Sequence, residues 1–351
     1  MSIRILQIGA GIRGRHWAQF VAAYPDAECV ALVEPDAEAR AKAMSIIGDG
    51  GKCRPYAGID EALGEISADA ALIVSPSVMH AEMTLRCLDA GLTVLVEKPL
   101  VRTIDEGRRV LHRARATGKQ VIVAENYRYW PAERTVRRML QEGFLGAIDN
   151  ATMTDRRNQP SRTEAPWFRS VEYPQLREIA IHHFDSMRAF FGSHPKEIAV
   201  RVWNPPWTDY DHGANTDALV DFGAVRVQYL GTLQSHRFGF SLWIEGERGV
   251  LWTNRKFVAW RPKGKRLFRP IRNDKVPKGD EKPYPQGGTT SLLNSLRDAV
   301  RHGTPGETRA DDNIWTVAMV EAGMLSDRER RTVSLAEVLP EGGGEGAERP
   351  D

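Results

Sequence analysis

The first 125 residues alternate between short apolar runs and stretches of helical periodicity, and this alternation constrains the fold more than any other feature. The runs are continuous and rich in Val, Ile and Leu, as expected for strands that helices cover on both faces. The predicted strands are Ile3–Ile8, Cys29–Glu34, Ala70–Ser75, Thr93–Glu97 and Gln120–Ala124. The predicted helices are Arg13–Ala23, Asp36–Ile46, Ser77–Ala90 and Thr103–Thr117. The pattern predicts an α/β Rossmann domain with a doubly wound parallel sheet.

The pattern changes after Gly146, where strand-like runs dominate and short glycine-containing turns join them. The predicted strands are Asp149–Thr154, Glu197–Trp203, Asp217–Phe222, Val225–Thr232, Phe238–Glu245 and Gly249–Thr253. The predicted helices are Pro131–Glu142, Leu176–Phe191, Thr290–His302 and Asp311–Asp327. This order indicates an α+β C-terminal domain with a large, mainly antiparallel sheet and one helix-covered face. We expect a first domain over 1–125, a second over 126–338 and a disordered Gly/Glu-rich tail over 339–351.

Composition and charge exclude several classes of protein. The 351 residues carry a formal net charge of +2, which favours neither nucleic acid nor an anionic membrane as a partner. The apolar runs are too short to span a bilayer, and glycines and charged residues interrupt residues 1–20, where a signal peptide would be apolar. Cys29, Cys53 and Cys87 form no CxxC pair, so we expect no disulfide framework and no thiolate zinc site. These features predict a cytoplasmic protein.

A glycine turn, Gly9-Ala10-Gly11-Ile12-Arg13-Gly14, follows the first predicted strand and opens the first helix. Gly9 permits the tight turn, Gly11 lets the backbone approach a pyrophosphate, and Gly14 allows the helix to pack closely on the strand. The amides at the helix start, around Ile12 and Arg13, offer hydrogen-bond donors and the positive end of the helix dipole to phosphates. The turn therefore predicts a bound dinucleotide.

Two other strand ends belong to the same predicted crevice. Glu34 ends the second strand, twenty positions after Gly14. A carboxylate there accepts hydrogen bonds from the adenosine ribose and repels a 2′-phosphate, so we expect NAD(H) rather than NADP(H). Ser75-Pro76-Ser77 ends the third strand and should line the crevice, and Ser77 is also a candidate helix cap. His80 is either a cofactor contact or a packing residue bonded to the backbone.

Lys98 lies where an apolar strand runs into Glu97-Lys98-Pro99. Together with the glycine turn, with Ser75-Pro76-Ser77-Val78-Met79-His80, and with Glu125-Asn126-Tyr127-Arg128-Tyr129-Trp130-Pro131, this motif resembles the Gfo/Idh/MocA family, the glucose–fructose oxidoreductase and inositol dehydrogenase-like oxidoreductases. The resemblance covers nearly the whole chain. It implies a Rossmann domain and an open-faced sheet that carries most substrate contacts and often oligomerises. Because an open apolar sheet face needs cover, we expect a homodimer or homotetramer.

The resemblance also implies roles for particular residues. Glu97, Lys98 and Asn126 would lie at the cofactor. Lys98 would bridge the nicotinamide ribose and the reacting hydroxyl of the substrate, where its ammonium stabilises developing alkoxide charge. A cis peptide bond would precede Pro99, as is common in this family.

The catalytic histidine is expected at His182, which occupies the histidine position of the family pattern Asp-x-Gly-x-His. Glu178 takes the place of the aspartate, with a side chain one methylene longer, and Ala180 takes the place of the glycine. In a helix Glu178, His182 and Asp185 share a face, so the Glu178 carboxylate would orient the imidazole of His182. His183 is either a structural histidine or a substrate contact.

Further substrate contacts are expected around this helix. Tyr127 and Arg128 match family positions that commonly reach the substrate, and Trp167 would stack on a sugar face. Arg169 would bond hydroxyls or a carboxylate. The arginines of the run 155–162, with Arg156 as the named candidate, would hold a carboxylate, phosphate or sulfonate, unless they belong to a solvated basic loop.

Two other polar segments carry weaker signals. Asp209, Asp211 and His212 resemble metal ligands by residue type only, so we expect no metal. The basic segment 254–283 is interpreted as a solvated hairpin or loop, with a subunit contact or a surface for an anionic ligand as the alternatives.

The sequence thus predicts an NAD(H)-dependent oxidoreductase that acts on a secondary alcohol or ketone of a sugar, sugar acid or cyclitol. An enzyme that cleaves glycosides by transient oxidation, elimination and re-reduction would use the same Lys98 and His182, so it remains an alternative. A non-catalytic NAD-binding sensor is a third interpretation, which the presence of both residues disfavours.

Overall fold

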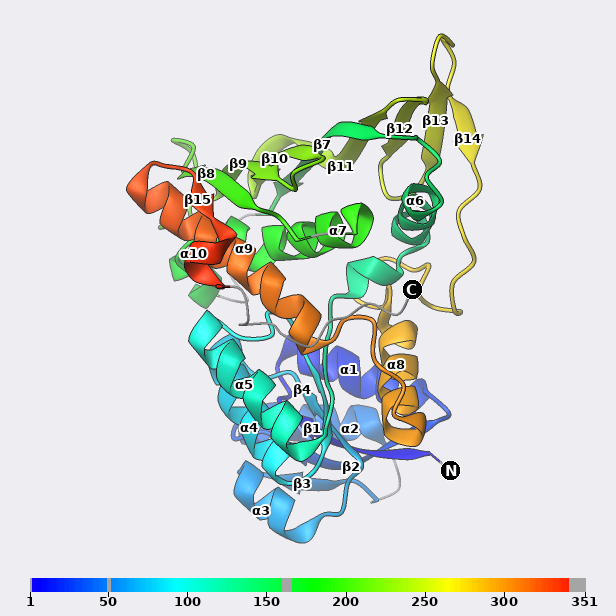
Figure 1. Cartoon of the computed structure of the whole chain (residues 1–351). Coiled ribbons are helices and arrows are strands. Elements are labelled where there is room, and N and C mark those ends of the chain that lie inside the picture. Colours follow the sequence, from blue (N-terminus) through cyan, green and yellow to red (C-terminus); the bar gives the residue numbers. More distant parts are fainter. Residues whose placement is uncertain (1, 49–51, 160–165, 193, 341–351) are drawn as a thin grey trace. The chain divides into compact units, whose positions relative to one another are not determined.

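The structure is a computed structural model that describes residues 2–48, 52–159, 166–192 and 194–340, without the side chains of Pro166 and Trp167 (Figure 1). The chain divides into two compact units. Among the described residues, unit 1 comprises 2–126 and 277–314, and unit 2 comprises 127–276 and 315–340. The predicted tail lies outside the described residues from position 341 onward.

Unit 1 is built on a parallel sheet with the strand order β3-β2-β1-β4-β5-β6. The strands are β1 (Ile3–Ile8), β2 (Ala27–Val33), β3 (Arg54–Tyr56), β4 (Ala70–Ile73), β5 (Thr93–Val96) and β6 (Val121–Val123). The doubly wound parallel sheet is confirmed, and β3 is an addition, because three residues that include Pro55 carry no strand pattern. The strand order reverses at β1 and β4, and ligands of such sheets bind outside the carboxyl ends of the strands at that point.

The helices of unit 1 are α1 (Ile12–Ala23), α2 (Ala37–Ile47), α3 (Ile59–Glu65), α4 (His80–Asp89), α5 (Ile104–Thr117) and α8 (Thr289–His302), and a 3₁₀ turn covers Ser77–Met79. Helix α1 packs beside α2 and α8, whereas α4 packs beside α5 (Figure 1). Local signals fix several helix ends. Thr103 and Glu106 form a reciprocal capping box at the start of α5, and Gly118 closes the same helix in the left-handed conformation.

Residues 277–314 return to unit 1, which differs from the expected continuous second domain over 126–338. Helix α8 contacts β5 and α1 and buries Leu292, Leu293 and Leu296. The segment before α9 also pairs with the sheet edge, because the Val123 amide donates to the Thr308 carbonyl (2.8 Å) and the Thr308 hydroxyl donates to the Val123 carbonyl (2.6 Å). A helical pattern in the sequence predicts that one face of the helix is buried, but it does not indicate which sheet that helix covers.

Unit 2 is built on a mixed sheet with the strand order β14-β13-β12-β11-β7-β10-β9-β8-β15, in which β7 and β10 are parallel and the other described pairs are antiparallel. The strands are β7 (Ile148–Asn158), β8 (Glu197–Trp203), β9 (Asn215–Asp221), β10 (Arg226–Thr232), β11 (Gln234–Gly246), β12 (Gly249–Thr253), β13 (Val258–Pro262), β14 (Arg269–Ile271) and β15 (Val333–Ser334). The helices are α6 (Pro131–Gln141), α7 (Ile181–Phe191), the later part of α9 (Ala310–Glu329) and α10 (Leu335–Val338). The predicted α+β domain with a mainly antiparallel sheet is confirmed.

One face of this sheet is buried under α7, and the other carries exposed apolar side chains (Figure 1). On β7, Ala151, Met153 and Asp155 are buried at alternate positions. The ring of Phe184 on α7 meets that of Tyr229 on β10 at 5.8 Å between centroids, which fixes the helix to this face. The site residues of unit 2 therefore have to be sought between α7 and the buried sheet face.

Two predicted helices differ in detail. Leu176–Ala180 forms a π-helical turn before α7, so the spacing that places Glu178 one α-helical turn from His182 does not apply there. Helix α9 begins at Ala310, one residue before the expected start at Asp311, and the Asp311 carboxylate accepts from the Asp312 amide in its first turn.

The basic segment 254–283 is partly the expected hairpin, since β13 and β14 pair within it. Its ends are buried, however. The Arg255 side chain is 9% exposed, and the Asp280 carboxylate accepts from the Thr290 and Ser291 amides beside the start of α8. A search of the described residues finds no helix long and apolar enough to cross a membrane.

Candidate active site

The glycine turn of unit 1 has the geometry that the motif predicts. Gly9 has φ +103°, and a Cβ there would lie 2.6 Å from the Val74 carbonyl carbon. A Cβ on Gly14 would lie 2.4 Å from the Gly9 carbonyl oxygen, whereas one on Gly11 would meet no described protein atom within 4 Å. The open space at Gly11 fits the close approach of a ligand to the backbone. Ile12 and Gly11 are exposed at this edge of the sheet.

Gln7 holds this turn, and sequence reasoning missed it. Its buried side-chain amide donates to the carbonyls of Gly9 (3.0 Å) and Gly14 (2.8 Å). A buried glutamine inside an apolar strand, just before a glycine turn, was the available signal, because buried polar groups are hydrogen-bonded.

Glu34 lies against the same turn. Its Oε2 accepts from the Ala10 amide (2.8 Å) and its Oε1 from the Asp36 amide (3.0 Å). These bonds hold a carboxylate at the carboxyl end of β2, where the adenosine ribose of a dinucleotide is expected.

Ser75 supplies a second sign of a ligand at this edge. Its hydroxyl is buried and has no hydrogen-bond partner in the described part of the chain. An orphan hydroxyl at the end of β4, together with the space above Gly11, fits a dinucleotide with polar groups at the switch point. Pro76 is exposed and Ser77 half-buried beside it.

The side chains of Glu97 and Arg13, two residues expected at the cofactor, pair with each other. Arg13 Nε (2.6 Å) and Trp17 Nε1 (2.7 Å) both donate to Glu97 Oε1, and the Lys98 amide donates to Oε2 (3.2 Å). Burial alone would raise the pKa of Glu97, but Arg13, Trp17 and Lys98 outweigh it and hold the pKa at about 2. Glu97 therefore ties α1 to the end of β5, next to Lys98.

The neighbours of Lys98 are held through the backbone. The Lys98–Pro99 peptide bond is cis. His80 spans two strand ends, with Nδ1 2.6 Å from the Pro99 carbonyl and Nε2 3.0 Å from the Ser75 carbonyl, and burial lowers its pKa. The structure thus favours the backbone-bonding interpretation of His80. The Asn126 amide is also occupied, because it donates to the Gly287 carbonyl (2.8 Å).

In unit 2, His182 lies at the start of α7 and is 8% exposed. Its imidazole stacks on the Tyr127 ring, with centroids 4.3 Å apart and planes 17° apart. Trp130 lies on the same tyrosine, 4.2 Å between centroids. The structure thus brings His182 and Tyr127 together. Glu178 is half-buried in the π-helical turn.

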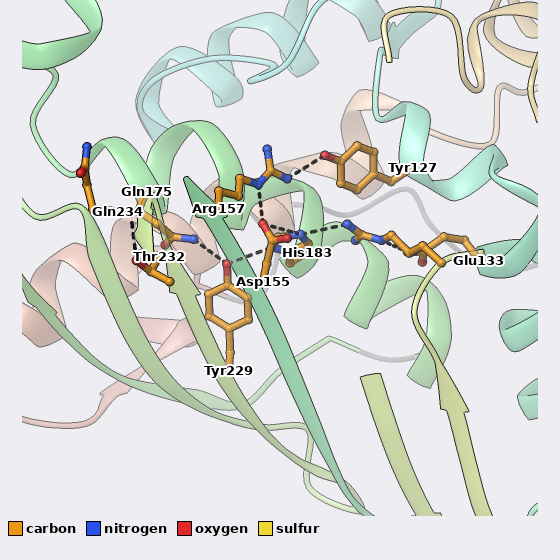
Figure 2. Close-up of polar contacts among 10 residues, drawn as sticks. Tyr127, Glu133, Asp155, Arg157, Gln175, His183, Tyr229, Thr232 and Gln234 are labelled. Atoms are coloured by element: carbon orange, nitrogen blue, oxygen red, sulfur yellow. Dashed lines mark hydrogen bonds and ion pairs between the residues drawn. The ribbon is translucent and has the colours of Figure 1, made fainter. Parts of the chain in front are cut away.

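A polar network underlies this stack (Figure 2). Arg157 donates from Nε to Asp155 (2.6 Å) and from Nη2 to the Tyr127 hydroxyl (3.1 Å). The Tyr229 hydroxyl lies 2.8 Å from His183 Nδ1 and accepts from Gln175 (2.7 Å). Of the two adjacent arginines on β7, Arg157 is therefore the one that donates to the Tyr127 hydroxyl. Arg156, the residue named from the sequence, occupies the alternate position of β7, and the period of two turns it to the opposite face.

His183 is a structural histidine. It is fully buried, and burial lowers its pKa well below the usual value, with Arg255 and Arg157 adding to the effect. Arg255 Nη1 lies 3.3 Å from His183 Nε2. Since a guanidinium only donates, Nε2 accepts and Nδ1 carries the proton that is donated to Tyr229. Both ring nitrogens are thus used within the protein, and the substrate-contact alternative is not supported.

Arg128 likewise has a protein partner. Its guanidinium makes two parallel bonds of 2.6 Å to the Asp185 carboxylate, and both groups are buried. This pairing, which the Thr316 hydroxyl joins (3.2 Å), explains Asp185 as the counter-ion of Arg128. The pairing uses Nε and Nη2 of Arg128, and a substrate contact by this residue stays a prediction.

The loop candidates give a mixed result. Arg169 is exposed and donates to Asp211 (3.0 Å), and Asp209 accepts from Gln234 (2.8 Å). Trp167 lies in a 3₁₀ turn, but its side chain is outside the described residues. No group of three His, Cys, Asp or Glu side chains with the spacing of a metal site occurs in the part of the chain that the structure describes.

Comparisons with known proteins agree with this geometry. Residues 3–125 match the Gfo/Idh/MocA model described as an oxidoreductase family with an NAD-binding Rossmann fold, and residues 134–252 match the C-terminal domain model of the same family. Inositol 2-dehydrogenase of Rhizobium meliloti is 24% identical over 96% of this chain and 100% of its own length. The NADP(+)-dependent scyllo-inositol 2-dehydrogenase IolW of Bacillus subtilis is 26% identical over 80% of this chain and 84% of its own length.

Among solved structures, an oxidoreductase from Agrobacterium radiobacter in complex with NAD+, L-tartaric acid and magnesium has the same fold. Its TM-score is 0.87, at 15% identity over 97% of this chain and 100% of that one. At this identity, the similarity between the two structures is evidence for the fold of each unit.

The bonds around Glu97 predict a pH dependence of stability. The pKa of Glu97 is about 2 in the folded chain, against 4.5 for an unperturbed glutamate. Its pairing therefore stabilises the folded state fully above pH 4.5, and this stabilisation is lost as the pH falls toward 2. We expect Glu97→Gln to lower the free energy of unfolding by about 3 kcal/mol at pH 7, and by progressively less below pH 4.5.

Urea denaturation of both proteins between pH 7 and pH 3 measures this difference. Glu65→Gln is the matched control, because Glu65 pairs with Arg54 at the surface. A difference between wild type and Glu97→Gln that stays constant across this range would contradict the assignment.

Proposed function

This chain belongs to the Gfo/Idh/MocA oxidoreductase family, and we propose that its reaction is hydride transfer between NAD(H) and a secondary alcohol or ketone of a sugar, sugar acid or cyclitol. The proposal rests on the groups that gather at one edge of the parallel sheet in unit 1. There the glycine turn, the orphan hydroxyl of Ser75 and Lys98 share the carboxyl ends of β1, β4 and β5. The inositol dehydrogenases among its relatives support the substrate class.

The cofactor would be held by residues whose geometry fits it. Gly11 leaves room for a pyrophosphate, Gly9 and Gly14 permit the turn and the close packing beside it, and Glu34 would present a carboxylate to the adenosine ribose. The nicotinamide, when bound, would supply the hydride chemistry. Glu97 acts one step away from it, since its bonds to Arg13 and Trp17 fix the strand end from which Lys98 projects.

Lys98 and His182 divide the work on the substrate oxygen in this proposal. The Lys98 ammonium stabilises negative charge on that oxygen as the carbon–hydrogen bond breaks. His182 accepts the hydroxyl proton as general base and returns it in the reverse direction. The imidazole stacks on Tyr127, and Trp130 packs on the same tyrosine ring. This packing restricts the orientation of the imidazole and so lowers the entropy lost on reaching the transition state.

We expect purified protein to form NADH from NAD+ with a member of a panel of inositols, sugars and sugar acids. Lys98→Met and His182→Asn should each lower turnover by about 10²- to 10⁴-fold, because each removes a group that acts on the reacting oxygen. Absorbance at the NADH band measures turnover, and quenching of protein fluorescence by NADH shows that cofactor binding persists.

Lys265→Met, in the exposed turn between β13 and β14, is the control and should behave as wild type. Wild-type turnover in either site variant would refute the assignment. Cleavage of a glycoside without net NADH would instead support the redox-cycling alternative.

For cofactor choice, we expect a higher kcat/KM with NAD+ than with NADP+, by about tenfold or more, because the Glu34 carboxylate would face a 2′-phosphate. Glu34→Ser should narrow that ratio mainly through KM for NADP+. Equal kcat/KM for the two cofactors in the wild-type protein would contradict this prediction. The comparison is informative because the Bacillus subtilis relative is NADP(+)-dependent.

We also propose that the open sheet face of unit 2 forms a homodimer or homotetramer interface. Trp203 (44% exposed), Leu219 (46%) and Trp243 (39%) lie on its strands, and apolar patches of this kind usually mark an interaction surface. Light scattering should give a dimer or tetramer, which Leu219→Glu dissociates. Leu267→Glu, at the β13–β14 turn, should leave the mass unchanged. A monomeric wild-type protein would contradict the proposal.

A further inference from the structure

Arg255 lies within the basic segment, in the turn between β12 and β13, and its backbone is unusual. Its φ is +69°, a region that residues other than glycine rarely adopt. The turn is held by side chains on both sides of it. The Arg255 amide donates to the Thr253 hydroxyl (3.0 Å), and Asn254 Oδ1 accepts from the amides of Lys256 (3.1 Å) and Phe257 (2.9 Å). This conformation accompanies a side chain that is nine-tenths buried.

The buried guanidinium has an ionic partner and an aromatic enclosure. Its Nε donates to Glu133 on α6 (2.8 Å), whose own side chain is 3% exposed. Its central carbon lies 3.7 Å from the ring centroid of Phe240, 4.4 Å from that of Tyr127 and 5.4 Å from that of Trp130. Cation–π attraction at these distances favours one placement of each ring.

Arg255 also reaches the residue next to His182. Its Nη1 donates to His183 Nε2 (3.3 Å), so it selects the ring orientation and tautomer of His183. Figure 2 shows the chain of contacts that runs from Glu133 to His183 and on to Tyr229. One side chain thus contacts both Tyr127, on which the His182 imidazole stacks, and the neighbour of His182 on α7.

This arrangement is costly for stability alone. The positive φ is unfavourable, a buried ion pair gains little over apolar packing, and Nη2 is buried without a hydrogen-bond partner in the described part of the chain. Such costs concentrate at functional sites, where geometry matters more than stability.

We propose that Arg255 is a positioning residue for the reaction: it fixes the Tyr127 ring and the His183 ring, and through them the imidazole of His182. The inference rests on the proposed function and adds to it a residue outside the motifs. Arginine is required because its planar fork can pair with Glu133, donate to His183 and stack on a ring at once, whereas a lysine ammonium cannot stack in the same way.

Two variants and one control test the proposal. Arg255→Lys keeps the charge opposite Glu133 and loses the planar fork. Arg255→Met with Glu133→Gln removes both buried charges together, so that no unpaired ion is left to unfold the chain. The control is Arg261→Lys on β13, since Arg261 also lies over an aromatic ring, Phe268 at 5.1 Å, and contacts none of the residues of this network in the described contacts.

The measurements are kcat, KM and the proton chemical shifts of the His182 ring in protein labelled with ¹³C-histidine. Stacking on Tyr127 shifts these protons through the ring current, so displacement of the imidazole moves them whether or not turnover is observed. We expect kcat to fall about 10- to 100-fold in both site variants, with KM for NAD+ unchanged and the His182 ring shift reduced. The control should match wild type in every respect.

Other results would overturn the proposal. If the double variant is folded and has wild-type kcat and His182 shifts, Arg255 is structural. If kcat falls while the His182 shifts stay unchanged, Arg255 does not act through that ring. If the wild-type protein transfers hydride to no substrate, the proposed function fails, and the ring shifts still decide whether Arg255 positions His182.

Discussion

A single carboxylate oxygen organises unit 1. Glu97 Oε1 receives both the Arg13 guanidinium and the Trp17 indole, and so joins the first helix after the glycine turn to the strand end that carries Lys98. Because a buried carboxylate without donors is strongly disfavoured, neither partner can be moved without the others. The distance between the glycine turn and Lys98 is thereby fixed by an interaction that needs no bound cofactor. The same arginine reaches the Pro285 carbonyl (2.8 Å) and extends this order to a distant segment of the chain.

Unit 2 holds helix α7 in place with several buried polar and charged groups. Helix α7 is buried almost throughout, yet it carries two histidines and Asp185. Asp185 and His183 are fully buried, and both have partners within the protein. Asp185 pairs with Arg128, and His183 lies between Tyr229 and Arg255. His182, which is slightly exposed, instead rests on an aromatic ring. The helix thus separates the polar groups that hold it in place from the one proposed to meet the substrate.

Sequence reasoning recovered what local patterns determine. The strand–helix alternation and the glycine turn follow from signals within a few residues, and the cis bond before Pro99 follows from the family resemblance. The positions of all three agree with the structure. It failed where the outcome depends on partners far away in the chain. For Arg128, nothing local in the sequence reveals that its guanidinium pairs with Asp185. Arg157 was passed over for Arg156 because the exact register of β7 decides which of two adjacent arginines faces α7. Arg255 was hidden in a stretch whose composition suggests solvent.

The return of residues 277–314 to unit 1 has a consequence for how this chain can be made. The Rossmann sheet cannot receive the cover of α8, or the edge contact of Thr308 with Val123, until the residues through 308 have been synthesised and have left the ribosome. During synthesis the first 126 residues must therefore persist with part of their apolar surface uncovered while the second unit is being produced. A fragment that ends at Asn126 would keep the nucleotide motif and lack the helix that completes its core. For unit 1, the order of synthesis and the order of assembly are therefore different.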